Sequence, residues 1–542
     1  MWRWVLLVAA ALSLLLLMVT KPAPFGDSRL YAGTEGYPWW NDTVFYEVFV
    51  RSFYDSDNDG NGDLNGLIEK LDYLNDGDPT TQTDLGVTGL WLMPISPSSS
   101  YHGYDVTDYY GIHPDYGSME DFKRLLTEAH RRGIRVIVDL VLNHTGIEHP
   151  WFVSAAQGPD SPYRNYFLWR DDDPGYANPQ GATAWNPAAS GYYYAAFWRE
   201  VPDLNLQNPD VVRHIEDITR FWLREVGVDG FRLDAVKHFV EEGAKQENTP
   251  GTHRWMKEYH RMYKAIAPRS LTVGEVWSPS REVAPYITEG ELDLAFEFDT
   301  AQAMIAAAQG ANANRIRIAH AVASRLYPAN QYATFLSNHD QNRVMSQLDG
   351  DLLKARVAAG LLLTGPGVPF VYYGEEVGMT GLKPDPDLRV PMQWENAAYA
   401  GFSAKNPWRA PNEPIGPLNV ADQDLDPDSL LNHYRRLIHL RQGHPALRMG
   451  VYAKVESSNP KVYAFLRQSR QEQVLVVINL SGQEIGEYGL DYGGSLGDIT
   501  SAVELLHELD VPPPALDDQG GFARYHPLES LAPAGVWVIQ LR

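Results

Sequence analysis

The sequence contains no cysteine among its 542 residues. Disulfide bonds, thiolate metal sites, cysteine nucleophiles and lipid attachment through an amino-terminal cysteine are therefore excluded. Basic residues are also scarce, because 45 Lys and Arg stand against 69 Asp and Glu, which gives a formal net charge of −24. A protein of this charge repels a phosphate backbone, so we expect no nucleic acid partner.

The first residues differ in character from the rest of the chain. Arg3 and Lys21 bracket an uncharged run dominated by Leu, Val and Ala, which is typical of an export signal. No small-x-small cleavage site follows cleanly, and the run is at the short limit for a spanning helix, so an uncleaved membrane anchor is the alternative. We predict that residues 1–27 are a signal peptide or membrane anchor. The body is then secreted or periplasmic, or attached to the outer face of the membrane.

The remaining chain is too long for one simple core and alternates strand-like and helix-like segments. One helix, for example, is capped by Ser118 with Asp121 three residues later and ends at Gly133. Such alternation indicates parallel βαβ units, and eight parallel strands close a barrel. The eight strand candidates are residues 43–53, 86–95, 134–143, 230–236, 271–277, 292–298, 332–336 and 368–373.

We therefore predict an α/β fold, a (β/α)8 TIM barrel formed by residues 37–143 and 208–446. Residues 144–207 interrupt the alternation after the third strand and are rich in Pro, Gly, Asp and aromatics, which indicates an inserted, loop-rich subdomain B. Residues 447–542 contain alternating strand patterns without helices, so we predict a C-terminal antiparallel β domain, a β-sandwich.

Polar and acidic side chains follow several predicted strands. Asp139, Asn143 and His144 follow the third, Asp234 the fourth, Glu275 the fifth, and His339 and Asp340 the seventh. In a parallel barrel these strand ends meet at one mouth, where several carboxylates do acid/base chemistry or bind a metal. Arg232 and Asp234 point to the same face of their strand, so the guanidinium is expected to lower the carboxylate pKa. Taken alone, such a pair is more often structural.

Seven segments in order resemble the α-amylase family, glycoside hydrolase family 13. Four look like its signature regions, and three look like its supporting segments; together they span roughly residues 40–450. The signature matches are Asp139–His144, Gly230–His238, Gly274–Trp277 and Phe335–Asp340, and the supporting ones are residues 86–95, 201–205 and 367–376.

The resemblance implies a retaining glycosidase. Asp234 would be the nucleophile, Glu275 the general acid/base with a raised pKa, and Asp340 a third carboxylate that grips sugar hydroxyls. Arg232 would keep the nucleophile charged. By the same resemblance, His144 and His339 hydrogen-bond the sugar, Tyr104 stacks on it, and Lys237 and His238 line the leaving-group side. The implied substrate-binding set is His102, Tyr104, Asp105, His144, Arg232, Lys237, His238 and His339.

The acidic loop of residues 55–63 places oxygen ligands at alternate positions with glycines between them, as a hard cation such as Ca²⁺ requires. It lacks the final glutamate of an EF-hand, because Gly66 occupies that position. Related enzymes hold Ca²⁺ on a similar loop, so the predicted ligands are Asp55, Asp57, Asp59, Asp63 and a carbonyl of Asn61. A solvated acidic turn is the alternative. A second Ca²⁺ site near Asn143 lacks an evident aspartate partner.

Members of this family differ in the glucosidic bonds that they cleave and in whether they act internally or at chain ends. Asp105 looks like the oligo-1,6-glucosidase branch, whose members pair it with an arginine, but Asp385 occupies the position aligned with that arginine. We therefore favour an α-amylase that cleaves α-1,4-glucans internally, resembling the intermediate group between oligo-1,6-glucosidases and neopullulanases. An exo-acting α-glucosidase or a transglycosylase is the alternative. In that case Arg389 would take the place of the missing arginine as the partner of Asp105. Transporter subunits of this family lose the catalytic carboxylates, which this chain keeps. We expect a monomer.

Overall fold

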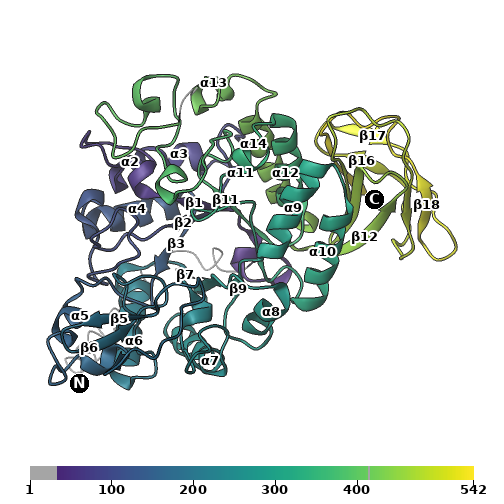
Figure 1. The fold of residues 1–542 in the computed structure, drawn as a ribbon. Helices are drawn as coiled ribbons and strands as arrows, with labels where there is room; N and C mark the ends of the chain where they lie inside the picture. The colour runs from purple at the N-terminus through teal and green to yellow at the C-terminus, as the bar shows by residue number, and fades with distance from the viewer. Residues whose placement is uncertain (1–32, 413–415) are drawn as a thin grey trace, which may run out of the picture.

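The computed structural model describes residues 33–412 and 416–542. Its centre is a parallel β-barrel, seen along its axis in Figure 1. The eight strands lie in the order β10-β11-β1-β2-β3-β7-β8-β9, and every neighbouring pair is parallel. The predicted barrel is thus confirmed. The strands are β1 Phe45–Val48, β2 Gly89–Leu92, β3 Arg135–Leu140, β7 Gly230–Leu233, β8 Leu271–Gly274, β9 Leu294–Ala295, β10 Ala333–Thr334 and β11 Val368–Tyr372.

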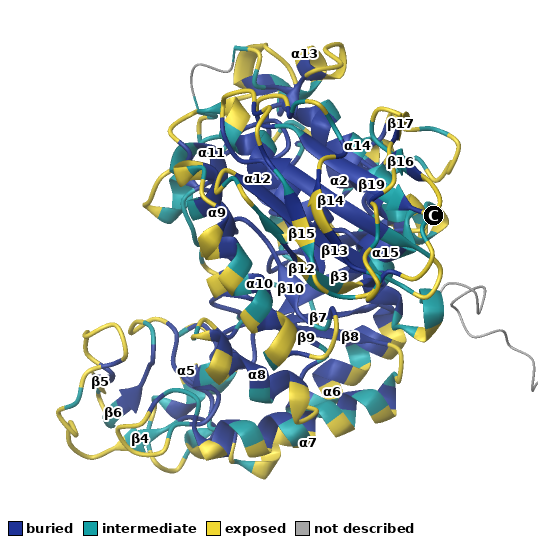
Figure 2. Ribbon diagram, turned by 90° about the vertical axis from the view of Figure 1, so that its right-hand side faces the viewer, coloured by how far each residue is buried: buried dark blue, intermediate teal, exposed yellow. Residues whose placement is uncertain are grey.

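The ring closes between its two shortest strands. A parallel bridge joins Phe296, just after β9, to Ala333 in β10, and the Glu297 amide donates to the Ala333 carbonyl at 3.0 Å. Every residue of β1, β2, β3, β7, β8 and β11 is buried, because helices cover the outside and aromatic side chains fill the inside. In Figure 2 the labelled strands β3, β7 and β8 are drawn in the dark blue of buried residues. Phe45 stacks on Phe370 inside the barrel, with ring centroids 4.4 Å apart.

The outer helices begin and end where the sequence signals predict. Ser118 forms a capping box with Asp121 at the start of α4, whose buried face is apolar. Asn208 caps α6, with Pro209 in its first turn. The helices around the barrel are α2 Leu64–Glu69, α3 Leu71–Leu74, α4 Met119–Arg131, α6 Pro209–Arg220, α7 Pro250–Ile266, α8 Ser280–Thr288, α9 Phe298–Gly310, α10 Asn314–Leu326, α11 Val344–Gln347, α12 Leu352–Thr364, α13 Val420–Asp424, α14 Leu430–Gly443 and α15 Pro445–Met449.

The insertion after β3 forms a small lobe of its own, at the lower left of Figure 1. It contains α5 Pro150–Ala155 and an antiparallel sheet in the order β4-β6-β5, made of Trp169–Arg170, Gly191–Tyr194 and Trp185–Ala188. An antiparallel bridge between His144 and Asp203 ties its two ends together beside the barrel mouth. The lobe therefore returns the chain to the place where it left the barrel.

The C-terminal strands form one antiparallel sheet in the order β17-β16-β19-β14-β13-β12-β15-β18, where a sandwich was expected. Side chains of all eight strands meet in one core, so the sheet curls around itself. Alternate residues of β13 face opposite ways, since Val462 and Ala464 join that core while Tyr463 and Phe465 join the barrel's core. The strands are β12 Val451–Ser457, β13 Val462–Gln468, β14 Gln473–Asn479, β15 Leu490–Tyr492, β16 Ala502–Glu504, β17 Leu509–Val511, β18 Phe522–Tyr525 and β19 Val536–Leu541.

The predicted signal peptide or anchor, residues 1–27, lies outside the described residues. Among the helices from residue 33 onward, none is long and apolar enough to cross a membrane.

Candidate active site

Arg232 is the centre of the polar cluster at the barrel mouth. Its side chain is fully buried and reaches three carboxylates from three neighbouring strands: one Nη atom lies 3.0 Å from Asp139 and 2.7 Å from Asp234, and the other lies 2.6 Å from Glu275. The stretch identified in the sequence thus brings two of the predicted catalytic carboxylates onto one guanidinium. A shared guanidinium keeps these two carboxylates near each other, and a retaining glycosidase needs its two carboxyl groups about 5 Å apart.

The backbone turns sharply after Asp234 to make this contact. Ala235 has a φ of 53°, in the left-handed region that a residue with a Cβ seldom adopts. In this conformation the Ala235 amide donates to the Glu275 side chain at 3.3 Å, and the Val236 amide donates to the Glu275 carbonyl at 3.1 Å. Local strain at a functional position is held by such surrounding contacts. The turn therefore fixes Asp234 and Glu275 relative to each other.

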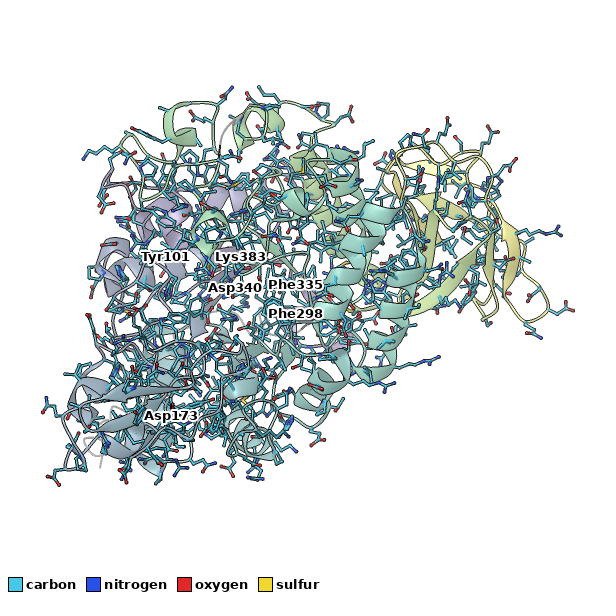
Figure 3. All side chains as sticks on the ribbon, viewed as in Figure 1. Tyr101, Asp173, Phe298, Phe335, Asp340 and Lys383 are labelled. Atoms are coloured by element: carbon cyan, nitrogen blue, oxygen red, sulfur yellow. The ribbon has the colours of Figure 1, made fainter. Side chains whose placement is uncertain are left out.

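Asp340 completes the cluster from the segment that follows β10, over the barrel centre in Figure 3. Arg389 lies 2.7 Å from one of its oxygens and His339 lies 3.2 Å from the other. Burial alone would raise the pKa of Asp340, but these two cations hold it well below its usual range. Asp340 is therefore a fixed negative charge in the site.

The other two carboxylates behave differently. Burial raises the pKa of Glu275, and the charges of Asp234 and Asp340 raise it further, although Arg232 opposes them. This confirms the expected direction for a general acid. Burial also raises the pKa of Asp234, so the expectation that Arg232 would leave it lowered is wrong: the guanidinium does lower it, but desolvation is larger.

The histidines of the site divide into two kinds. Burial lowers the pKa values of His102, His144 and His238 to about 4, so these imidazoles are neutral at neutral pH and suit hydrogen bonding to sugar hydroxyls. His144 Nε2 is buried without a partner among the described residues. His339 is the exception: although burial lowers it, Asp340 and Glu47 raise its pKa to about 9.

One cavity of about 440 Å³ joins most of the predicted residues. It also contains residues that were not predicted to bind substrate. Gln180, Phe197 and Trp198 come from the insertion, where no motif pointed to them, and Trp277 ends the signature match Gly274–Trp277 but was given no role. The predicted residues that line it are His102, Tyr104, His144, Asp234, Lys237, His238, Glu275 and Asp340, together with Asp385 and Arg389.

Three predicted residues do not line the cavity: Arg232, Asp105 and His339. Arg232 contacts Asp234 and Glu275, which do line the cavity, and so affects the site through these carboxylates. Asp105 is buried and faces away, accepting hydrogen bonds from the Ser100 hydroxyl and, at 3.2 Å, from the Ser99 amide. Its one ion-pair partner among the described residues is His102, at 3.9 Å. Arg389, the candidate substitute partner, pairs with Asp340 and, at 3.6 Å, with Asp385.

Asn143 contacts an aspartate of the insertion. Its side-chain amide donates to Asp203 at 2.8 Å, and both side chains are almost fully buried. Asp203 lies at the far end of the insertion, so its sequence position gave no sign of this contact. Burial raises the pKa of Asp203 well above its usual range.

The acidic loop gathers carboxylates from Asp55, Asp57 and Asp63, whose ligand atoms lie within 4.8 Å of one another. Burial and the neighbouring carboxylates raise the pKa of Asp57. Asp59, which was also predicted as a ligand, is not part of this cluster. Asp59 accepts the Asn61 amide at 2.7 Å, and the Asn61 side-chain oxygen accepts a hydrogen bond from Arg51. The donor set of three carboxylates fits a hard cation.

Residues 47–450 match the family described as "Alpha amylase, catalytic domain". The chain belongs to the α-amylase family, glycoside hydrolase family 13. Residues 452–513 match the description "Maltogenic Amylase, C-terminal domain". The protein is thus an α-amylase-family glycosidase of the retaining type that acts on α-glucans by hydrolysis or transglycosylation.

Several relatives illustrate the range of the family. Alpha-amylase 3 of Dictyoglomus thermophilum is 41% identical, over 82% of this chain and 86% of its own. Oligo-1,6-glucosidase of Parageobacillus thermoglucosidasius is 31% identical, over 82% and 90%. The crystal structure of α-amylase from H. orenii superposes with a TM-score of 0.79 at 39% identity, over 92% of this chain and 99% of that one. The family is therefore settled, whereas the relatives differ in their named activities.

Proposed function

We propose that this protein is an α-amylase that hydrolyses internal α-1,4-glucosidic bonds in starch-type glucans and maltooligosaccharides. Asp234 attacks the anomeric carbon while Glu275 gives its proton to the leaving glycosidic oxygen, and a glycosyl ester on Asp234 results. Glu275 then takes a proton from a water molecule that attacks the anomeric carbon, and the ester bond to Asp234 breaks. The single observation that carries this assignment is Arg232, which holds both carboxylates on one guanidinium.

Electrostatics favour these roles. Glu275 has the raised pKa of a proton donor, since Asp234 and Asp340 lie close to it in a buried site. Asp340 keeps its charge and can accept hydrogen bonds from sugar hydroxyls beside the reacting carbon. Glycosyl transfer develops positive charge on the sugar ring, so a fixed anion beside it stabilises the transition state.

The surroundings of Asp105 support internal cleavage. In the exo-acting branch an aspartate at this position is paired with an arginine, which blocks the end of the sugar chain. Here Asp105 is engaged by Ser99, Ser100 and His102, and Arg389 is committed to Asp340 and Asp385. Since Asp105 has no arginine partner among the described residues, we expect that end of the site to accept a longer chain.

Two tryptophans also support the binding of several sugar units. Trp198 is 42% exposed beside His102, with ring centroids 5.6 Å apart. Trp277 is 41% exposed, stacks on Phe298 at 4.7 Å, and accepts a hydrogen bond from Lys237 through its carbonyl. Exposed aromatic faces suit the apolar faces of sugar rings. Since they come from different loops, they can contact different units of one glucan.

The test is the product pattern from starch and from maltotriose. We expect a rapid loss of iodine staining together with a mixture of oligosaccharides. Release of glucose alone from chain ends would reject internal cleavage and favour an exo-acting α-glucosidase, and the formation of new disaccharides without net hydrolysis would favour a transglycosylase.

We also propose that the acidic loop binds Ca²⁺ through Asp55, Asp57 and Asp63. A bound cation would relieve the repulsion among these carboxylates and stabilise the folded state. The loop contacts a distant segment, because the Asp55 amide donates to the Phe402 carbonyl at 3.1 Å and the Trp408 amide to the Gly60 carbonyl at 2.8 Å. Chelation should therefore lower the melting temperature, and Asp57→Asn should reduce that response. An unchanged melt would reject the site.

We also propose, from its amino-terminal residues, that the protein is exported. Expression in a bacterium followed by fractionation and mass measurement distinguishes a cleaved signal peptide from an uncleaved membrane anchor. A shortened soluble chain outside the cytoplasm supports a signal peptide, and a full-length chain in the membrane fraction supports an anchor.

A further inference from the structure

Glu47 is a buried carboxylate that none of the matched motifs assigns to the reaction. It lies in β1, is 2% exposed, and its Oε1 is 2.5 Å from Nδ1 of His339, which is fully buried. His339 Nε2 faces the site, 2.7 Å from the Tyr104 hydroxyl and 3.2 Å from Asp340. His339 therefore stands between Glu47 and two residues that line the cavity.

One placement of the protons satisfies all of these hydrogen bonds. Asp139 accepts from Arg232 through both carboxylate oxygens, so the Tyr104 hydroxyl, 3.0 Å away, donates its proton to Asp139. The Tyr104 oxygen then accepts from His339 Nε2, which must carry a proton. The Glu47 carboxylate only accepts, so Nδ1 must carry a proton as well. In this placement His339 is an imidazolium ion.

The charged groups around His339 agree with this assignment. Glu47 faces it from β1, Asp139 from β3, Asp234 from the end of β7, and Asp340 from its own segment, while Tyr104 and the Arg232 guanidinium close the cluster. Arg389 donates to the His339 backbone carbonyl at 3.0 Å. The pKa of His339 is raised to about 9 although burial opposes it, because Asp340 and Glu47 favour the charged form.

We propose that Glu47 is a positioning residue for the reaction: it keeps His339 doubly protonated and oriented, so that His339 donates to Tyr104 and to Asp340 from one nitrogen. This inference rests on the roles proposed for Asp340 and Tyr104, and it is independent of the choice between internal and end-wise cleavage.

Glu47→Gln tests the charge at nearly constant shape. The amide can still accept from Nδ1, but it supplies no negative charge, so His339 should lose its proton at a lower pH. Removal of an opposite charge at this distance changes a pKa by about one to three units. A neutral His339 protonated on Nδ1 offers no proton to Asp340 or Tyr104 from Nε2. The loss of a charge-assisted hydrogen bond should reduce kcat/KM by about tenfold.

The first measurement is the titration of His339 by NMR of protein with ¹⁵N-labelled histidine, with the signal assigned by its absence in His339→Gln. In the wild type we expect no titration of this signal below pH 8. In Glu47→Gln it should titrate lower by about one to three pH units, and in Glu47→Asp, which retains the charge, it should remain near the wild-type position.

The second measurement is kcat/KM on a maltooligosaccharide at pH 5.5 and pH 8. From pH 5.5 to pH 8, kcat/KM of Glu47→Gln should fall by about tenfold more than kcat/KM of the wild type falls. Glu47→Asp, which retains the charge, should show a smaller fall than Glu47→Gln. Glu291→Gln is the matched control. Glu291 is also fully buried and pairs with a histidine, His253 Nδ1 at 2.9 Å, but it lies outside the cavity, so its pH profile should match the wild type.

The outcomes are distinct. A wild-type His339 that titrates near pH 6.5 overturns the proposal even if no Glu47 variant folds. A lowered titration in Glu47→Gln with an unchanged rate profile overturns the positioning role. Failure of the proposed function itself would appear elsewhere, as full activity in Asp234→Asn.

Discussion

Replacement of Arg232 by methionine provides a direct test of the electrostatic account of the site. Arg232 is completely buried and contacts Asp139, Asp234 and Glu275 at 3.0, 2.7 and 2.6 Å. Methionine fills much of the same volume but leaves three carboxylates without a buried counter-charge. Removal of one partner of a buried ion pair typically costs about 3–5 kcal/mol, because the other charge stays desolvated.

The expected loss can be measured as an apparent melting temperature. With an unfolding entropy of about 2.1 cal/mol/K per residue, a chain of this length has an entropy near 1 kcal/mol/K, so 3–5 kcal/mol corresponds to about 3–5 °C. The second variant is Arg232→Met combined with Asp139→Asn. It removes one of the carboxylates that Arg232→Met leaves without a counter-charge, so it should recover part of the lost stability. The effects of the two substitutions on stability are then non-additive.

The pH dependence of this loss has a definite sign. Without Arg232 the pKa values of the three carboxyl groups in the folded state rise further above their unfolded values, near 4. Groups of this kind favour folding while protonated and disfavour it as the pH rises through the folded pKa. The deficit of Arg232→Met relative to the wild type should therefore be larger at pH 8 than at pH 5. A variant as stable as the wild type at pH 8, or a deficit that is equal at both pH values, would refute the reasoning.

Three further predictions concern the reaction. Asp234→Asn should reduce kcat by about 10⁴-fold or more with an unchanged fold by circular dichroism, and retained activity would overturn the nucleophile assignment. Glu275 must be protonated to act as an acid, so activity should fall as the pH rises through its raised pKa; Glu275→Gln should be far slower and lack this alkaline decline, which a pH–rate profile would show. Trp277→Ala should raise KM for long glucans by about 2–10-fold with little effect on maltotriose, whereas an equal effect on both would argue against a role in binding distant sugar units.

Much of the fold was determined by local sequence patterns. The alternation of apolar strands with capped amphipathic helices specifies parallel βαβ units, and helix α4 begins at Ser118 because its capping box satisfies the first free amides. The strand ends placed Asp234, Glu275 and Asp340 at one mouth, since parallel strands in a barrel share one carboxyl end. These features depend on residues close together in the chain, which is why the sequence by itself was enough.

The remaining features depended on contacts between distant segments. Glu47 and His339 meet only because β1 and the segment after β10 both belong to the closed barrel. Asp203 meets Asn143 only because the insertion folds back on itself. Charge balance is also a tertiary property: Arg232 alone predicts a lowered pKa for Asp234, but burial reverses it. Desolvation and long-range pairing depend on what surrounds a group in space, and the order of residues along the chain does not contain that information locally.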